Sequence, residues 1–258
     1  MLNEGIDQWA REHSVTRRDA LQTALQIIVL RHLSDEKAAF MGGTALVLGF
    51  GNPRFSEDLD FTQVVHPLVL ESGLKKAARE AGEWMGAPAR LTPPKKGGRT
   101  WRLSCALSPS ETVQLHIDSQ PYRAHTVASI VISFPGLPSV VCRSLTVNEI
   151  MAEKILALAG RRYLSGRDLF DLWFHWLARP GADETGSEIR ALAVRKMKER
   201  RLTVGVVREL LTSRLRPSMD LTRARQEWKR YLPASFQKSD VLNQIAEGAL
   251  TIPERLAL

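Results

Sequence analysis

The segment spanning residues 40–63, "FMGGTALVLGFGNPRFSEDLDFTQ", constrains the fold of this chain more than any other. The run "KAAFM" favours a short buried strand that ends at a glycine turn, and "TALVLGF" favours a helix that begins at that turn. The alternating pattern of "EDLDFTQ" is typical of a second strand. The segment therefore predicts that a short crossover brings a glycine turn and a pair of acids together.

Two carboxylates one residue apart, Asp58 and Asp60, are the most specific chemical feature of this segment. Side chains at i and i+2 of a strand point the same way, so both acids share one face while Leu59 and Phe61 take the other. Adjacent carboxylates repel, which raises the pKa of one of them unless a divalent cation binds both. The structural alternative is a solvated edge strand that carries two acids.

The glycine turn favours the metal-binding interpretation. Gly42 and Gly43 let the backbone approach a ligand closely, and the helix after them offers amide donors that can hold a phosphate. Thr44 adds a hydroxyl at the same place. A phosphate cradle beside a carboxylate pair suits phosphoryl or nucleotidyl transfer, because these reactions depend on positioning and charge neutralisation.

A third carboxylate is expected on a neighbouring strand, and Asp118 in "TVQLHIDSQ" fits this position. Alternation puts the apolar residues of this segment on one face and leaves His116 and Asp118 on the other. We expect Asp118 to complete a metal site with Asp60 and to act as general base toward an attacking hydroxyl. A surface aspartate is the alternative. His116 is expected near the metals but not as a ligand.

The pattern of the chain changes near residue 145. Residues 16–33 have the spacing of an amphipathic helix, and residues 100–108 and 112–120 alternate like paired strands, whereas the apolar run "ASIVISF" leaves the element type open. Helical patterns follow one another to the end. Strands first and helices afterwards predict an α+β fold in residues 1–139, followed by a C-terminal helical domain in residues 140–258.

Composition narrows the class of protein. The 36 basic and 28 acidic residues give a net charge of +8, which favours a polyanionic partner such as RNA, DNA or a nucleotide, with a merely basic surface as the alternative. Two cysteines cannot make a disulfide framework, and the first residues lack the pattern of a signal peptide, so a cytoplasmic location is expected. No apolar run approaches the roughly 20 residues that span a bilayer.

Lys154 lies inside the apolar stripe of its predicted helix. Its side chain either extends to water along its own stem or needs an anion, for which a nucleotide phosphate is the candidate. Arg161 projects from nearly the same face, and Asp171 and His175 form a polar stripe on the next helix.

Several other charged residues have open interpretations. Asp168 is expected to cap its helix or to pair with Arg167, and an ion-pair network is the structural explanation of both acids on that helix. Arg54 is expected either to reach a phosphate or to pair with Glu57. The loop that contains Lys95, Lys96 and Arg99 is expected to be a solvated turn, with contact to an RNA backbone as the alternative.

Other nucleotide and metal sites fit poorly. A P-loop needs Gly-Lys-Ser/Thr where this chain has Gly-Thr-Ala, and "GFGNPRF" lacks the third glycine of a dinucleotide fingerprint. There is no Cys-x-x-Cys and no His-Glu-x-x-His, so oxygen ligands and Mg²⁺ or Mn²⁺ are expected.

Four motifs in order, "GGTALVLG", "RFSEDLDF", "EIMAEKILAL" and "GRDLFDLW", resemble the AbiEii/AbiGii toxin family, which includes the MenT toxins and lies within the nucleotidyltransferase superfamily. The resemblance implies a nucleotidyltransferase-like fold, which is a mixed sheet with flanking helices followed by the helical domain. It also implies an active site completed by Lys154 and Asp171, with Lys154 on the nucleotide phosphates. Gly-Thr stands at the turn where the superfamily often has Gly-Ser, so the hydroxyl is kept.

The resemblance also implies a function. Asp58, Asp60 and Asp118 would bind Mg²⁺ or Mn²⁺, and Gly42, Gly43, Thr44, Lys154 and Arg161 would bind a nucleoside triphosphate. The implied acceptor is RNA, specifically a tRNA 3′ end, so that translation is blocked, and the implied partner is a cognate antitoxin. The alternatives are a nucleotide-binding interaction protein with little transfer, and an antibiotic-type small-molecule nucleotidyltransferase.

Overall fold

The computed structural model describes residues 2–33, 38–108 and 111–256, with the side chains of residues 2, 3 and 182 left out. Lys37, at the start of the first predicted strand, lies outside these ranges. The chain divides into two units. The sheet unit comprises Met1–Gly51 and Phe55–Leu145, and the helical unit comprises Asn52–Arg54 and Thr146–Leu258.

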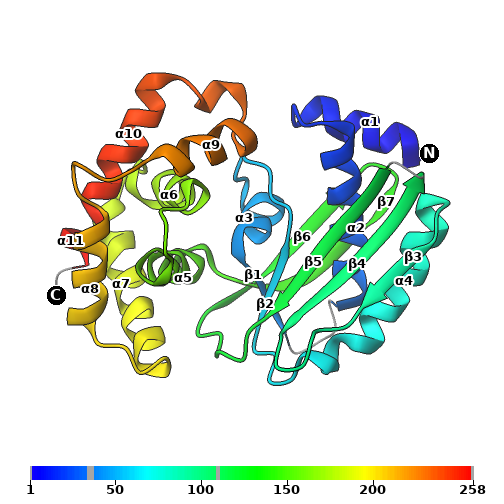
Figure 1. The fold of residues 1–258 in the computed structure, drawn as a ribbon, viewed down its shortest axis with the longest axis horizontal. Coiled ribbons are helices and arrows are strands. Elements are labelled where there is room, and N and C mark those ends of the chain that lie inside the picture. Colours follow the sequence, from blue (N-terminus) through cyan, green and yellow to red (C-terminus); the bar gives the residue numbers. More distant parts are fainter. Residues whose placement is uncertain (1, 34–37, 109–110, 257–258) are drawn as a thin grey trace. The chain divides into compact units, whose positions relative to one another are not determined.

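A seven-stranded sheet forms the centre of the sheet unit, with the order β3-β4-β5-β2-β1-β7-β6 (Figure 1). The sheet is mixed, as the family resemblance implies, because β2 pairs parallel with β5 and β1 pairs parallel with β7 while the other neighbours are antiparallel. The strands are β1 (Ala39–Met41), β2 (Leu59–Thr62), β3 (Ala89–Thr92), β4 (Thr100–Ser108), β5 (Glu111–Ser119), β6 (Val127–Phe134) and β7 (Leu137–Leu145).

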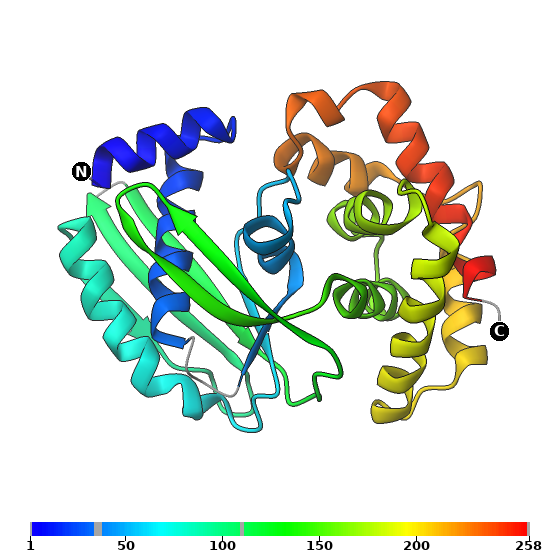
Figure 2. The ribbon, with the colours of Figure 1, turned by 180° about the vertical axis from the view of Figure 1, so that it is seen from behind.

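Helices cover one face of this sheet (Figure 2). The helix α2 (Arg17–Leu33) crosses it and is buried on most of its surface, because the strands lie on one side and α1 (Leu2–Glu12) and α4 (Glu71–Met85) pack against it as well. The spacing of residues 16–33 predicts the helix correctly, but not this burial on several sides. The remaining short helices of the sheet unit are α3 (Gly42–Phe50) and η1 (Pro67–Leu70).

The two faces of the sheet differ in chemistry. Leu59 and Phe61 of β2 and Ile117 of β5 are buried, as the alternation predicts. Asp60 and Asp118 project from the opposite face, where they are only partly covered. We call this the open face; it carries the acids that the sequence analysis singles out.

The helical unit has a core built around Trp176 and Trp228, which are almost fully buried. Thr146 and Ser165 cap the first two helices, each by accepting a hydrogen bond from the amide three residues later. No helix in the described residues is both long and apolar enough to cross a membrane. The helices are α5 (Val147–Gly160), α6 (Gly166–Leu172), η2 (Trp173–Leu177), α7 (Ala182–Glu199), α8 (Val204–Arg214), α9 (Thr222–Tyr231), η3 (Ala234–Phe236), α10 (Ser239–Leu250) and α11 (Ile252–Arg255).

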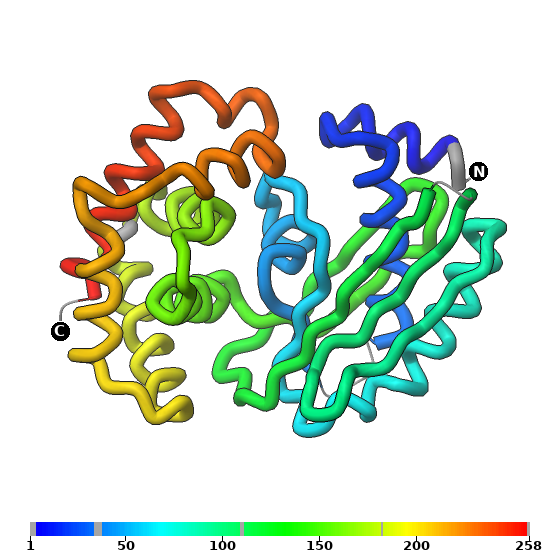
Figure 3. Tube along the Cα trace, in the orientation of Figure 1, coloured from blue at the N-terminus to red at the C-terminus, as the bar shows by residue number. Residues whose placement is uncertain are grey.

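The predicted domain boundary at residue 139 falls inside β7. This strand is hydrogen-bonded to β6 and β1, so the sheet unit continues to Leu145. The chain trace can be followed through the connection from α3 to β2 (Figure 3). This connection contains Asn52–Arg54, which belongs to the helical unit instead. Local sequence pattern does not predict this assignment, because Asn52 and Arg54 bond to Asp171, which is more than a hundred positions away.

Candidate active site

The glycine turn lies directly between β1 and α3, and Gly42 is the first residue of the helix. Its φ of 80° lies in the left-handed region, and a Cβ built on it would come within 2.2 Å of Oδ2 of Asp60. Any other residue here would combine backbone strain with a clash against the carboxylate. The turn is therefore packed against one of the predicted metal ligands.

Thr44 connects this helix to the residues before β2. Its buried hydroxyl lies 2.9 Å from the Ser56 hydroxyl and donates to the backbone carbonyl of Asp58. These contacts fix the start of α3 against the residue that carries the first acid. Binding of a phosphate by Thr44 stays a prediction, and the described contacts give the hydroxyl a positioning role.

Asp60 and Asp118 are direct partners in the parallel register of β2 and β5. Both side chains project from the open face, so the sequence places the third acid on the right face and on a strand adjacent to β2. The hydroxyl of Thr100, on β4, donates a hydrogen bond to Oδ1 of Asp118 and orients this carboxylate. Local pattern does not reveal Thr100, because β4 and β5 meet only through the register of the sheet.

Asp58 precedes β2, and its Oδ1 lies 3.4 Å from Nδ1 of His116 on β5. Both side chains are about two-fifths exposed. His116 therefore lies beside the acids, as the sequence suggests, and contacts one of them. The two strands bring Asp58, Asp60, His116 and Asp118 to the same region of the open face.

These acids offer the oxygen ligands that Mg²⁺ and Mn²⁺ prefer. In the described chain, no group of three His, Cys, Asp or Glu side chains has the arrangement of a ready-made metal site. Mg²⁺ is commonly held by one or two carboxylates together with substrate phosphates and water. The donor set fits such an ion, and the Asp60–Asp118 pair is the natural place for it.

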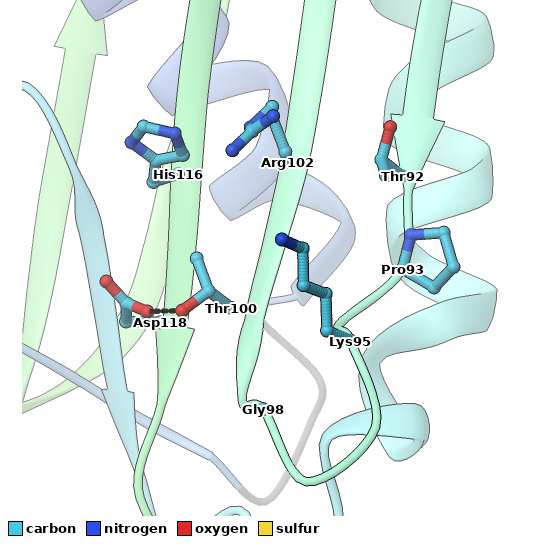
Figure 4. A pocket seen from close by; sticks show the side chains of 8 residues that line it. All are labelled: Thr92, Pro93, Lys95, Gly98, Thr100, Arg102, His116 and Asp118. Carbon is cyan, nitrogen blue, oxygen red and sulfur yellow. Dashed lines mark hydrogen bonds between the residues drawn. The ribbon is translucent and has the colours of Figure 1, made fainter.

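A pocket of about 420 Å³ borders Asp118 on the open face. Thr100, His116 and Asp118 line it together with Lys95 and Arg102 (Figure 4). The two cationic side chains come from the β3–β4 connection and from β4, and Figure 4 shows them pointing toward the side of the pocket that carries His116 and Asp118. An anionic ligand in this pocket would lie near Lys95 and Arg102, next to Asp118, for which the sequence predicts a role as general base.

The helical unit contains a second cluster of charges. Arg54 donates two hydrogen bonds to Asp171, at 2.6 and 2.8 Å, and Asn52 donates a third to the same carboxylate at 2.9 Å. Lys154 lies 2.7 Å from Asp168 and 2.9 Å from Asp171. Of the two alternatives for Lys154, extension to water or a nearby anion, the structure therefore has the second, and the anions are two carboxylates of α6.

Burial and charge compete in this cluster. Burial alone would lower the pKa of Lys154, but Asp168 and Asp171 outweigh it and raise that pKa above its ordinary value. Burial would raise the pKa of Asp171, but Arg54 and Lys154 hold it well below its usual range. Lys154, Asp171 and Arg54 are therefore charged at neutral pH.

Asp168 has neither of its two expected roles in the structure, which were to cap its helix or to pair with Arg167. Asp168 pairs with Lys154 and with Arg161, whose Nη1 lies 3.1 Å away, whereas Ser165 caps the helix. Arg167 is instead 3.9 Å from Glu227 of α9. The sequence cannot reveal this exchange, because Glu227 approaches α6 only through the packing of the helices.

Comparison with known proteins gives the class. The fold resembles the solved structure of MenT4, the nucleotidyltransferase toxin Rv2826c of Mycobacterium tuberculosis H37Rv, with a TM-score of 0.57 and 20% identity over 96% of this chain and 98% of that one. It also resembles a candidate nucleotidyltransferase from H. pylori, with a TM-score of 0.54 and 17% identity over 94% and 97% of the two chains. The fold is thus that of nucleotidyltransferase toxins.

A family model identifies the chain more narrowly. Residues 24–246 match the nucleotidyl transferase AbiEii toxin of type IV toxin–antitoxin systems. The chain belongs to this family of nucleotidyltransferase toxins, so the resemblance inferred from the four sequence motifs is confirmed. A search of curated protein sequences gives no match.

Proposed function

We propose that this toxin transfers a nucleotide from a nucleoside triphosphate to the 3′ hydroxyl of an RNA, specifically a tRNA. The acceptor oxygen attacks the α-phosphorus, the bond from that phosphorus to the bridging oxygen breaks, and pyrophosphate leaves. Asp118 takes the proton of the attacking hydroxyl. A tRNA with a blocked 3′ end cannot be aminoacylated, so translation stops.

The observation that carries this proposal is the register of two strands. Asp60 lies directly opposite Asp118, and the glycine turn packs against Asp60. A triphosphate at the start of α3 and a hydroxyl beside Asp118 would then approach the same pair of carboxylates. Such an arrangement supports transfer because positioning and charge neutralisation provide most of the catalysis.

Each residue has a proposed role. Asp58, Asp60 and Asp118 bind Mg²⁺ or Mn²⁺, and Gly42, Gly43 and Thr44 bind the triphosphate at the start of α3. A bound ion supplies neutralisation of the phosphate charge and of the pyrophosphate that leaves. Thr100 holds the Asp118 carboxylate in one orientation, which keeps its proton-accepting oxygen available to the acceptor.

On the family resemblance, Lys154 and Arg161 are proposed as nucleotide-binding residues, and Asp171 as a residue of the active site that positions Lys154. Within the helical unit their described contacts are structural, because Lys154 pairs with Asp168 and Asp171 and Arg161 pairs with Asp168. A substrate phosphate would share Lys154 with these carboxylates. In this proposal Asp171 orients Lys154 and does not itself contact the nucleotide.

A toxin of this family acts within a toxin–antitoxin system, so an antitoxin is the expected partner. We propose that the antitoxin prevents damage to tRNA in the host cell. The net charge of +8 supports an RNA acceptor over an antibiotic-type small molecule, since a basic surface attracts polyanions.

The test is a transfer assay with purified protein, unfractionated tRNA, Mg²⁺ or Mn²⁺, and each α-labelled nucleoside triphosphate in turn. The unmodified protein is expected to label tRNA with at least one nucleotide. Asp60→Asn should reduce the rate at least roughly a hundred-fold, because it removes one negative charge from the carboxylates proposed to hold the divalent ion while keeping the shape of the side chain. The control Asp7→Asn changes an exposed acid of α1 and should leave the rate unchanged.

Three outcomes would contradict the proposal. If a folded Asp60→Asn protein still labels tRNA at the normal rate, the Asp60 carboxylate is not needed for transfer. Nucleotide binding without transfer to any RNA would favour the interaction protein. Transfer to a small molecule but not to tRNA would favour the antibiotic-type enzyme.

A further inference from the structure

The pocket beside Asp118 contains charges that the proposed chemistry does not use. Lys95 and Arg102 both line it and are exposed. Neither side chain has an ion pair or a hydrogen bond with another part of the described chain. Two unneutralised cations in a concave site of about 420 Å³ favour an anionic ligand.

A neighbouring arginine shows the contrast. Arg99, in the same connection, donates from Nε to the carbonyl of Ser119 at 2.7 Å and from Nη2 to the carbonyl of Val64. Its charge serves to hold the connection against the sheet. Lys95 and Arg102 have no such structural task, so their positions in the pocket are better explained by a ligand.

The order of the strands shows where the pocket lies relative to the glycine turn. Across the open face the order runs from β4 through β5 with Asp118 and β2 with Asp60 to β1, which ends at the glycine turn. Strands lie about 4.8 Å apart, so β4 and β1 are separated by roughly 14 Å. The pocket and the glycine turn therefore lie on opposite sides of the two carboxylates.

Nucleotidyl transfer needs such an arrangement, because the attacking and leaving oxygens are in line on opposite sides of the phosphorus. The glycine turn is the proposed site of the triphosphate, which leaves the pocket for the other substrate. A polynucleotide acceptor has a backbone phosphate one nucleotide before its terminal hydroxyl. Two cations next to Asp118 suit this phosphate.

Resting on the proposed transfer, we propose that Lys95 and Arg102 bind a backbone phosphate near the 3′ end of the RNA acceptor and so direct its terminal hydroxyl to Asp118. The pocket is then the acceptor subsite. The loop between β3 and β4, which is expected from the sequence to be a solvated turn, contributes one specific residue, Lys95, to substrate binding. Its neighbour Lys96 does not line the pocket and provides a matched control.

The first measurement is the affinity for 5′-fluorescein-labelled tRNA, by fluorescence anisotropy without nucleotide, over a series of KCl concentrations. Lys95→Ala and Arg102→Ala should each weaken binding several-fold. Each should also make the dependence of log K on log salt shallower by roughly 0.7, which is the contribution of one phosphate contact on a single strand. Lys96→Ala should change the affinity much less and leave the slope unchanged.

The second measurement is steady-state transfer with the same proteins. Lys95→Ala and Arg102→Ala are expected to raise KM for tRNA several-fold and to leave KM for the nucleotide unchanged. A rise in KM for the nucleotide instead would assign the pocket to the donor and overturn the proposal. Equal effects of Lys95→Ala and Lys96→Ala would overturn it too, because they would indicate a general basic surface.

Failure of the proposed function is distinguishable from failure of this inference. If no protein transfers nucleotides but Lys95→Ala and Arg102→Ala still lose tRNA affinity and salt dependence, the pocket binds RNA and the transfer reaction is wrong. If the unmodified protein transfers nucleotides and the two variants bind tRNA normally, the reaction stands and the pocket assignment is wrong. Absence of tRNA binding by the unmodified protein also overturns the assignment.

Discussion

At the scale of single residues, Gly42 has two independent reasons to be glycine. One is its positive φ, and the other is the distance of 2.2 Å that a Cβ would have to Oδ2 of Asp60. Gly51, at the end of α3, has a similar φ of 71° but nothing within 4 Å of its added Cβ. Substitutions at these two glycines therefore distinguish the effect of backbone strain from the effect of a clash with the carboxylate.

We predict that Gly51→Ala costs about 1 kcal/mol of unfolding free energy and keeps its transfer activity, because only the backbone is strained. Gly42→Ala should cost more, about 2–3 kcal/mol, and lower transfer at least ten-fold, because Asp60 must move. Urea unfolding and the tRNA-labelling assay measure the two effects. Equal losses of activity in both variants would contradict a specific role for the Gly42–Asp60 contact.

Some residues of the candidate site could be predicted from local sequence pattern, and others could not because they join the site through pairing between strands. The faces of Asp58, Asp60 and Asp118 follow from alternation, which is a local property, and the structure agrees with them. Thr100 and Arg102 join the site through the pairing of β4 with β5. Pairing across strands depends on register, which a single sequence does not specify residue by residue.

At the scale of elements, the Asp171 carboxylate links three parts of the helical unit. It accepts from Asn52 and Arg54, and it pairs with Lys154 of α5. The side chain of Asp171 is fully buried and that of Arg54 nearly so, and the charges are stable only because they neutralise one another. The sequence predicts the polar stripe but not its completion by Asn52 and Arg54.

We predict that Asp171→Ala destabilises the protein by about 3–5 kcal/mol, because it leaves two buried cations with one fewer carboxylate. Asp183→Ala removes a carboxylate that is 95% exposed and pairs with Arg255, so it should cost less than about 1 kcal/mol. Urea unfolding followed by tryptophan fluorescence gives both values. Similar midpoints for the two variants would contradict the structural role of Asp171.

At the scale of the whole molecule, the order of strands followed by helices was predictable because period-2 and period-3.6 patterns are local. The burial of α2 and the position of β7 were not, since both depend on which elements pack together. The same limit applies to His175, which a helical wheel places on a polar stripe. In the structure it is 2% exposed, and neither ring nitrogen has a hydrogen-bond partner within the described residues.

Burial lowers the pKa of His175 to about 4, from an ordinary value near 6.5. Between these values the unfolded chain binds a proton that the folded chain does not, so the unfolding free energy decreases as the pH falls from about 6.5 to 4, by up to about 3 kcal/mol. His175→Leu should flatten this part of the pH profile, while His66→Gln, at an exposed position, should not. Urea unfolding at several pH values measures the slope. An unchanged slope in His175→Leu would assign the titration to another group.

The assignment of Asn52–Arg54 to the helical unit affects how this protein can be divided into fragments. The chain passes from one unit to the other three times, after Gly51, after Arg54 and after Leu145. A single cut after Leu145 would leave Arg54 on the first fragment and its carboxylate partner on the second. A gene truncated at that point would encode a sheet unit whose Arg54 lacks Asp171, and the other fragment would lack three residues of the helical unit. A division of the chain after Leu145 would therefore separate a buried guanidinium from the carboxylate that neutralises it.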